Sequence, residues 1–238
     1  MQAYKTQFLE LALELGVLRF GEFELKSGRI SPYFFNAGLF NTGHAAAKVG
    51  RCYASALSDI DIEFDMLFGP AYKGIGLVAL TAAALAEHHD INSPFAYNRK
   101  EVKDHGEGGA SVGAEISGRV LILDDVITAG TAVTEAIQII RSEGGEPAGV
   151  LVALDREEVG SRGRESAVRE LGERLGVPVR SIVCLTDLVD HLENDARYAE
   201  FLPAMRSYRN QYGAALQNAT SYYRPSIPKN VIQLISPG

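Results

Sequence analysis

The stretch VLILDDVITAGTAVTEAIQII, residues 120–140, decides the fold of this chain. Its first part, Val120 to Leu123, is an unbroken apolar run of the kind that forms a strand buried on both faces of a parallel sheet. Two consecutive carboxylates, Asp124 and Asp125, follow the run, and a short loop then leads into a segment with helical spacing of apolar residues. A strand, a loop and a helix in this order predict one unit of an α/β sheet, with the loop at the edge where such sheets bind ligands.

Apolar runs and helical stretches alternate over much of the chain. The further predicted strands are Met66–Phe68, Phe95–Tyr97, Val150–Leu154 and Ile182–Leu185, and the predicted helices are residues 74–87 and 132–142. Before them we expect an amphipathic helix ending at Gly16, short strands and turns between residues 20 and 40, and a helix capped by Thr42. The predicted fold class is therefore α/β, with a central and mostly parallel sheet flanked by helices.

The composition restricts the classes of function. The chain has 238 residues, and 30 acidic against 23 basic side chains give a formal net charge of −7. A field of that sign repels polyanions, so we expect no nucleic-acid partner. No segment reaches the roughly 18 uncharged apolar residues of a membrane span, and the start of the chain lacks the unbroken apolar core of a secretory signal. Cys52 and Cys184 are too few for a disulfide framework, which favours a cytoplasmic protein.

The loop after Asp125 has the features of a phosphate site. Backbone N–H groups at the start of the following helix, with the hydroxyls of Thr128 and Thr131, would form a cradle for an anion, and Gly130 permits close approach of the backbone. The glycine and lysine pattern of a nucleotide P-loop is absent from the sequence. Two carboxylates beside a phosphate would repel it unless they face hydroxyl groups or a cation. A phosphorylated sugar with vicinal hydroxyls and a magnesium ion meets both conditions.

A second group of cations precedes a run of glycines. Arg99, Lys100, Lys103 and His105 fall within seven residues, and glycines follow at positions 106, 108, 109 and 113. A cationic loop rich in glycine is suited to close over a diphosphate and to exclude water from it.

The segment DDVITAGTA, residues 124–132, closely resembles the phosphoribosyl-diphosphate motif of the type I phosphoribosyltransferases. Within that group the chain resembles the orotate phosphoribosyltransferase family. Further matching strings are KSGR at residues 26–29, SPYFFN at 31–36, GPAYKG at 69–74 and RKEVKDHG at 99–106. Their joint order and spacing extend the resemblance over residues 1–213.

The resemblance implies a type I phosphoribosyltransferase-like fold, with one domain over residues 1–213, a hood of about residues 1–40 and a flexible catalytic loop. Residues 214–238 would be a C-terminal extension of unknown role. It implies a homodimer in which the loop and Lys100 act on the neighbouring subunit's site. It also implies Mg²⁺ bound mainly through phosphoribosyl diphosphate, so we expect no dedicated protein ligands for the metal. The reaction would transfer phosphoribosyl from 5-phosphoribosyl 1-diphosphate to orotate, in pyrimidine biosynthesis.

The same resemblance implies roles for individual residues. Catalysis would depend on Lys26, Lys103, Asp124 and Asp125. The expected contacts to phosphoribosyl diphosphate are Lys26, Tyr72, Lys73, Arg99, Lys100, Lys103, His105, Asp124, Asp125, Val126, Ile127, Thr128, Ala129, Gly130, Thr131 and Ala132. The expected contacts to orotate are Phe34, Phe35, Thr128 and Arg156. An arginine suits the carboxylate that distinguishes orotate from neutral pyrimidines.

Two other functions stay open at this point. One is a phosphoribosyltransferase for another base, such as a purine, because the phosphate machinery would be shared. Arg156 and the pair Phe34 and Phe35 favour orotate instead. The other is a non-catalytic regulator that senses phosphoribosyl diphosphate and binds DNA, but the sequence has no additional basic module before the site residues.

Overall fold

A computed structural model of the chain describes residues 1–25, 27–100, 110–127, 130–160, 162–163 and 165–214. Within them a six-stranded sheet has the strand order β5-β4-β3-β6-β7-β8. The parallel strands are β3 (Met66–Gly69), β4 (Phe95–Asn98), β6 (Arg119–Asp124), β7 (Glu146–Asp155) and β8 (Val179–Cys184). Strand β5 (Ser111–Gly113) lies at one edge and pairs antiparallel with β4. The prediction of a mostly parallel sheet is confirmed.

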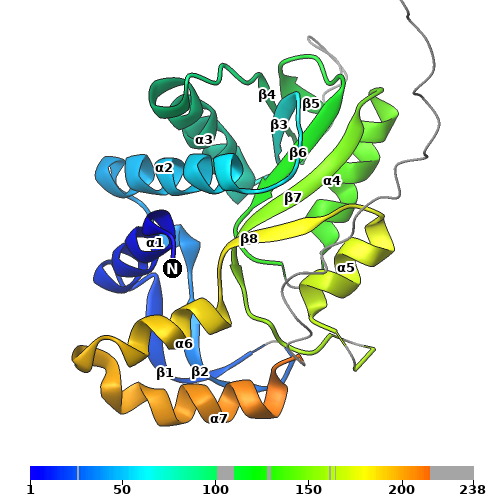
Figure 1. The fold of residues 1–238 in the computed structure, drawn as a ribbon. Helices are drawn as coiled ribbons and strands as arrows, with labels where there is room; N and C mark the ends of the chain where they lie inside the picture. Colours follow the sequence, from blue (N-terminus) through cyan, green and yellow to red (C-terminus); the bar gives the residue numbers. More distant parts are fainter. Residues whose placement is uncertain (26, 101–109, 128–129, 161, 164, 215–238) are drawn as a thin grey trace, which may run out of the picture.

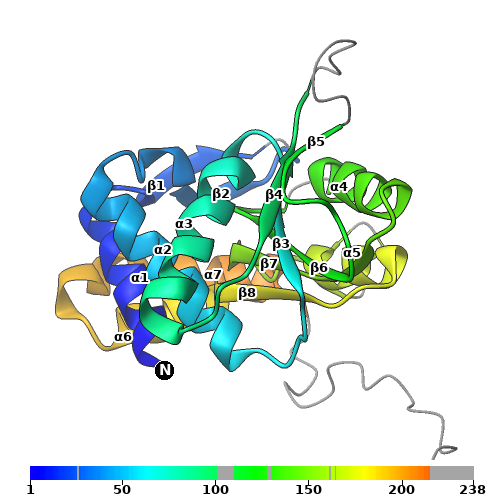
Figure 2. The same ribbon diagram turned by 90° about the horizontal axis from the view of Figure 1, so that it is seen from above.

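Helices cover both faces of this sheet. Helices α2 (Gly43–Asp59) and α3 (Lys73–His89) lie on one face, and α4 (Thr131–Ser142) and α5 (Ala167–Leu175) lie on the other (Figures 1 and 2). The side chain of Thr42 accepts a hydrogen bond from the Ala45 backbone N–H at 3.2 Å, as expected for the N-cap of α2.

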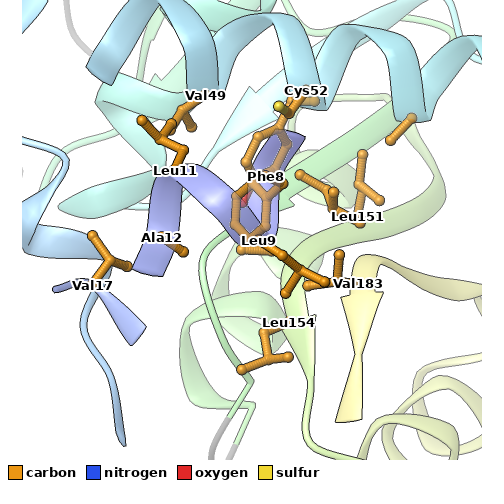
Figure 3. Packing of buried hydrophobic residues seen from close by; sticks show 14 of the residues in the cluster. Phe8, Leu9, Leu11, Ala12, Val17, Val49, Cys52, Leu151, Leu154 and Val183 are labelled. Atoms are coloured by element: carbon orange, nitrogen blue, oxygen red, sulfur yellow. The ribbon is translucent and has the colours of Figure 1, made fainter. Parts of the chain in front are cut away.

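The two cores follow from the alternation of side chains along the strands. In β6, Leu121 and Leu123 join the cluster under α1, α2 and α3, whereas Val120 and Ile122 join the cluster under α4 and α5. Helix α1 (Ala3–Glu14) contributes Phe8 to the first cluster, where Figure 3 shows it among residues of α2 and the sheet. Strand β6 is therefore covered on both faces, as its unbroken apolar run predicted.

A second layer is built from both ends of the described chain. Strands β1 (Leu18–Glu24) and β2 (Ile30–Phe35) form an antiparallel hairpin, followed by the short helix η1 (Ala37–Leu39). Helices α6 (Leu185–Glu193), η2 (Ala196–Phe201) and α7 (Leu202–Tyr212) pack beside this hairpin (Figure 1). An isolated hairpin is marginally stable in water, so the helices supply its apolar cover. The helices that follow β8 thus pack beside the segment of about residues 1–40 that we predicted as a hood.

Two predictions at element boundaries were wrong. Residues 111–113, which we expected in a loop, form the edge strand β5, because their backbone pairs with residues 96–98 of β4. Leu185, which we expected at the end of a strand, begins α6 and is completely buried. In the part of the chain that the structure describes, no helix is both long and apolar enough to span a membrane.

Candidate active site

The carboxyl ends of β3, β4, β6 and β7 meet at one edge of the sheet, and most of the predicted site residues lie there. Asp124 ends β6, and Asp125 follows it with only 8% of its surface exposed. The Asp125 backbone N–H donates to Asp124 Oδ1 at 2.9 Å, and the hydroxyl of Tyr53 on α2 donates to the Asp124 carbonyl at 2.7 Å. These bonds hold the two carboxylates side by side at the mouth of the loop.

A lysine from another part of the sequence compensates one of these charges. Lys73, the first residue of α3, forms an ion pair with Asp125 through its Nζ atom. Burial and, to a smaller extent, the negative charge of Asp125 together raise the pKa of Asp124 to about 6, although the Asp125 N–H and Lys73 oppose the shift. The site thus holds a carboxyl group whose negative charge is costly, and hydroxyl groups or a cation beside it would lower that cost.

The raised pKa of Asp124 predicts that this group lowers the stability of the protein as the pH rises. Between its ordinary pKa of 3.8 and the folded-state value of about 6, the folded chain binds more protons than the unfolded chain, so the free energy of unfolding falls with pH. We expect Asp124→Asn to be more stable than the natural chain at neutral pH, by up to about 3 kcal/mol, and to lose this advantage below about pH 4. Urea unfolding at acidic and neutral pH measures the difference, and an equal advantage at both would contradict the assignment.

The start of α4 lies where the anion cradle was predicted. Gly130 precedes the helix in a left-handed conformation, with φ of 74°, and a Cβ atom there would lie 2.6 Å from Leu171 Cδ1. Thr131 is exposed and Ala132 half-buried in the first turn, where backbone N–H groups have no partner within the helix. Val126 and Ile127 pack into the two cores instead of lining the site with their side chains. Thr128 and Ala129 lie outside the described residues.

The turn between β3 and α3 is held by a residue that the sequence analysis missed. Asn98, the last residue of β4, is 5% exposed, and its Oδ1 accepts a hydrogen bond from the Ala71 backbone N–H at 2.7 Å. The Ala71–Tyr72 peptide is cis, and the Tyr72 side chain is 75% exposed at the same edge as Asp125. The sequence did offer a signal for this role, since Asn98 directly follows the apolar run Phe95–Tyr97. A buried side-chain amide at that position needs a hydrogen-bond partner.

The predicted cationic loop is described only at its ends. Arg99 follows β4, and its backbone N–H donates to the Ala110 carbonyl at 2.9 Å. Lys100 forms an ion pair with Glu135 of α4 at 3.2 Å, and both side chains are partly exposed. Lys103 and His105, like Lys26 of the hairpin, lie outside the described residues.

The residues predicted for the base divide between two environments. Phe35 packs against Phe8 and Phe40, with ring centroids 6.3 and 6.5 Å away, whereas Phe34 contacts Phe23 at 5.5 Å. Adjacent residues of a strand point to opposite sides, so only one of the two rings can join the core.

Arg156 follows β7 at the same sheet edge. Its Nε donates to Glu158 at 2.6 Å and its Nη2 donates to Ser31 at 2.9 Å, and its guanidinium lies 4.2 Å from the ring centroid of Tyr33. The arginine is thus fixed between β7 and the hairpin.

The donor set at this edge is poor in metal ligands. In the described ranges, no group of three or more His, Cys, Asp and Glu side chains could hold a metal ion. Asp124 and Asp125 supply carboxylate oxygens that suit Mg²⁺, but Asp125 is already paired with Lys73. These residues fit a magnesium ion only if ligand oxygens and water complete its coordination.

Comparison with known proteins adds the family to this geometry. Residues 38–171 match the family model of the phosphoribosyl transferase domain. Curated proteins described as orotate phosphoribosyltransferase, from a strain of Pseudomonas putida and from Pseudomonas aeruginosa, are each 59% identical over 213 residues, which is 90% of this chain and 100% of theirs.

A solved structure has the same fold. The crystal structure of an orotate phosphoribosyltransferase from Francisella tularensis superposes with a TM-score of 0.78 at 40% sequence identity, covering 87% of this chain and 99% of that one.

Proposed function

This chain belongs to the orotate phosphoribosyltransferase family, and from that membership we propose that it transfers the phosphoribosyl group of 5-phosphoribosyl 1-diphosphate to orotate. The products are orotidine 5′-phosphate and diphosphate, which places the enzyme in pyrimidine biosynthesis. The observation that carries this proposal is the arrangement of Asp124 and Asp125 beside Lys73 and the start of α4. Anions, hydroxyl groups and a sugar phosphate can be bound together at such an edge.

The proposed chemistry is mainly electrostatic. Breaking the bond between the anomeric carbon and the diphosphate oxygen leaves positive charge on the ribose and negative charge on diphosphate, and a ring nitrogen of orotate attacks the anomeric carbon. Asp124 and Asp125 would hold the ribose hydroxyls and lie close to the developing cation. The N–H groups at the start of α4 would bind the 5′-phosphate, and Lys73 would bind diphosphate. No covalent intermediate with the protein is needed.

The contacts of the remaining predicted residues are part of the same proposal. Those to phosphoribosyl diphosphate come from Lys26, Tyr72, Arg99, Lys100, Lys103, His105 and the loop 126–132, and those to orotate come from Phe34, Phe35, Thr128 and Arg156. Mg²⁺ would neutralise charge on the diphosphate when it is bound with the substrate. Asp124 and Asp125 are the described residues best placed to meet such a complex.

We further propose a cytoplasmic homodimer in which residues 1–213 of each chain act as one domain. The thiols of Cys52 and Cys184 support a reducing compartment because neither is in a disulfide. The ion pair of Lys100 with Glu135 joins two partly exposed side chains near the surface and is therefore weak. Lys100 is thus free to exchange this partner for the diphosphate in a neighbouring subunit's site.

The direct experiment follows the ultraviolet absorbance of orotate in the presence of Mg²⁺ and phosphoribosyl diphosphate, with uracil, hypoxanthine and adenine in parallel. Consumption of orotate alone is the expected result. Consumption of another base would preserve the phosphate site and contradict the orotate pocket. Binding of phosphoribosyl diphosphate without turnover of any base would instead favour a sensor.

Replacing Lys103 with alanine should lower turnover much more than it weakens orotate binding. Its proposed partner, the leaving diphosphate, gains negative charge only as the bond breaks, so the lysine contributes more to the transition state than to the bound substrate. We expect kcat to fall about 10²-fold while the KM for orotate changes little. Steady-state kinetics with both substrates varied measure this, and equal changes in kcat and KM would refute the role.

A further inference from the structure

The surroundings of Arg156 contain groups that the proposed reaction has not yet used. Glu158 lies between two arginines, since its Oε1 accepts from Arg156 Nε at 2.6 Å and its Oε2 accepts from Arg29 Nη1 at 3.0 Å. The hydroxyl of Tyr208 on α7 also donates to Glu158 Oε1, at 2.7 Å. Only 12% of the Glu158 side chain and 17% of the Arg156 side chain are exposed.

The groups that surround the Arg156 guanidinium are buried. Ser31 and Tyr33 are fully buried in β2, and they provide the Nη2 acceptor and the ring beneath the guanidinium. Tyr208 is 4% exposed, and its ring meets that of Tyr33 edge to face at 6.2 Å. An arginine held on four sides has lost the rotamer freedom that ligand binding would otherwise have to remove.

Residues 212–214, at the end of the described chain, pair with the segment that contains Glu158. The Val159 N–H donates to the Tyr212 carbonyl and the Ala214 N–H donates to the Glu157 carbonyl, both at 2.8 Å, so residues 157–159 pair with residues 212–214 at the end of α7. Arg29, which holds the second oxygen of Glu158, also lies 5.2 Å from the ring centroid of Tyr212. The position of Glu158 is therefore set by the hairpin and by the C-terminal helix together.

The hydrogen bonds of this network leave the Nη1 group of Arg156 available for a ligand. As far as the described residues go, they use Nε and Nη2, and Nη2 also lies 3.4 Å from the Tyr208 hydroxyl. The two N–H groups of Nη1 are outside this network and can donate to a carboxylate. Holding Nε and Nη2 therefore fixes the direction in which Nη1 points.

We propose that Glu158, oriented by Tyr208 and Arg29, is a positioning residue that holds Arg156 for the carboxylate of orotate. The inference rests on the proposed function, because it names what selects the acceptor base at that same site. Through Tyr208, helix α7 would then help to bind the base, although α7 lies far from the phosphate loop in the sequence.

The decisive variant is Glu158→Gln, because positioning and simple electrostatics predict opposite results. Removing a negative charge beside Arg156 would strengthen the attraction for an anion if charge alone mattered. If Glu158 positions the arginine, an amide that presents an N–H group toward Arg29 disturbs the network, and orotate binds more weakly. We expect the KM for orotate to rise roughly tenfold or more and the KM for phosphoribosyl diphosphate to stay nearly constant.

Two further variants keep the test sharp. Tyr208→Phe removes one hydroxyl from the same network and should raise the KM for orotate in the same direction but by a smaller factor. Glu193→Gln is the control, because it breaks an exposed ion pair between α6 and α7, 2.7 Å from Glu193 Oε1 to Arg206 Nη2, without touching Arg156. It should leave both KM values unchanged. If Glu158→Gln does not fold, Tyr208→Phe decides the question.

A double-mutant cycle shows whether Glu158 acts through Arg156. In an Arg156→Ala background, Glu158→Gln should cause no additional loss of orotate binding. An unchanged or lower KM for orotate in Glu158→Gln would overturn the inference, as would equal rises in both KM values accompanied by a lower melting temperature. Failure of the natural chain to consume orotate would instead refute the proposed function itself, and that measurement precedes the variants.

Discussion

Replacing Asp124 and Asp125 together by asparagine is expected to reduce turnover by about 10³-fold or more while leaving the fold intact. The two carboxylates are the negative groups at the end of β6, and they are placed where the ribose would become positively charged. Asparagine keeps their shape but removes both charges, and Lys73 loses its partner and is left to bind diphosphate alone. Steady-state turnover of orotate, with circular dichroism as the check on folding, measures the effect.

The control for this pair is a variant that removes two other acidic charges. Asp61→Asn with Asp190→Asn changes the net charge by the same amount at exposed positions, and we expect its activity to be unchanged. Retention of activity in the Asp124 and Asp125 variant would refute the ribose assignment. A large loss in the control would mean that overall charge, and not the position of the carboxylates, governs the rate.

Replacing Gly69 by alanine is expected to cost roughly 3 kcal/mol or more of stability. A Cβ atom at Gly69 would overlap the carbonyl oxygen of Gly74, with the carbonyl carbon at 2.6 Å and Val78 Cγ1 at 2.8 Å. The collision is with backbone, so no side-chain rotation relieves it. Strand β3 and helix α3 must separate, and the turn that carries Lys73 moves with them.

The matched control for Gly69 is a glycine of the adjoining helix α3. A Cβ atom at Gly76 meets nothing within 4 Å, and alanine is favoured over glycine in a helix interior, so Gly76→Ala should keep or slightly raise the stability. Thermal unfolding should show a melting temperature lower by about 10 °C for Gly69→Ala only. Equal melting temperatures for the two variants would mean that the backbone can yield at the β3–α3 contact.

Local pattern was enough for the parts of the fold whose residues are close together in the sequence. The apolar run Val120 to Leu123, the two aspartates and the helix after Gly130 were predicted and are observed as β6 and α4. Thr42 was predicted to cap a helix and does so. Such elements depend on hydrogen bonds and apolar spacing within a few residues, and a sequence displays these directly.

Elements whose position depends on packing against distant parts of the chain could not be predicted in this way. The edge strand β5 is only three residues long and is defined by its pairing with β4. Helices α6 and α7 carry no strong sequence signal of their place, yet they pack beside the hairpin of β1 and β2. Their location depends on which apolar faces remain to be covered after the sheet has formed.

The sequence by itself determined the family resemblance, the α/β class and the identity of the acidic and cationic residues at the site. Only the tertiary structure decided which of them meet. Lys73 reaches Asp125 across 52 positions, and Asn98 holds the turn at Ala71 from the end of another strand. Glu158 meets Tyr208 across 50 positions and fixes Arg156 between them. Such pairs form because parallel strands bring their carboxyl ends to one edge, and a one-dimensional pattern does not contain that distance.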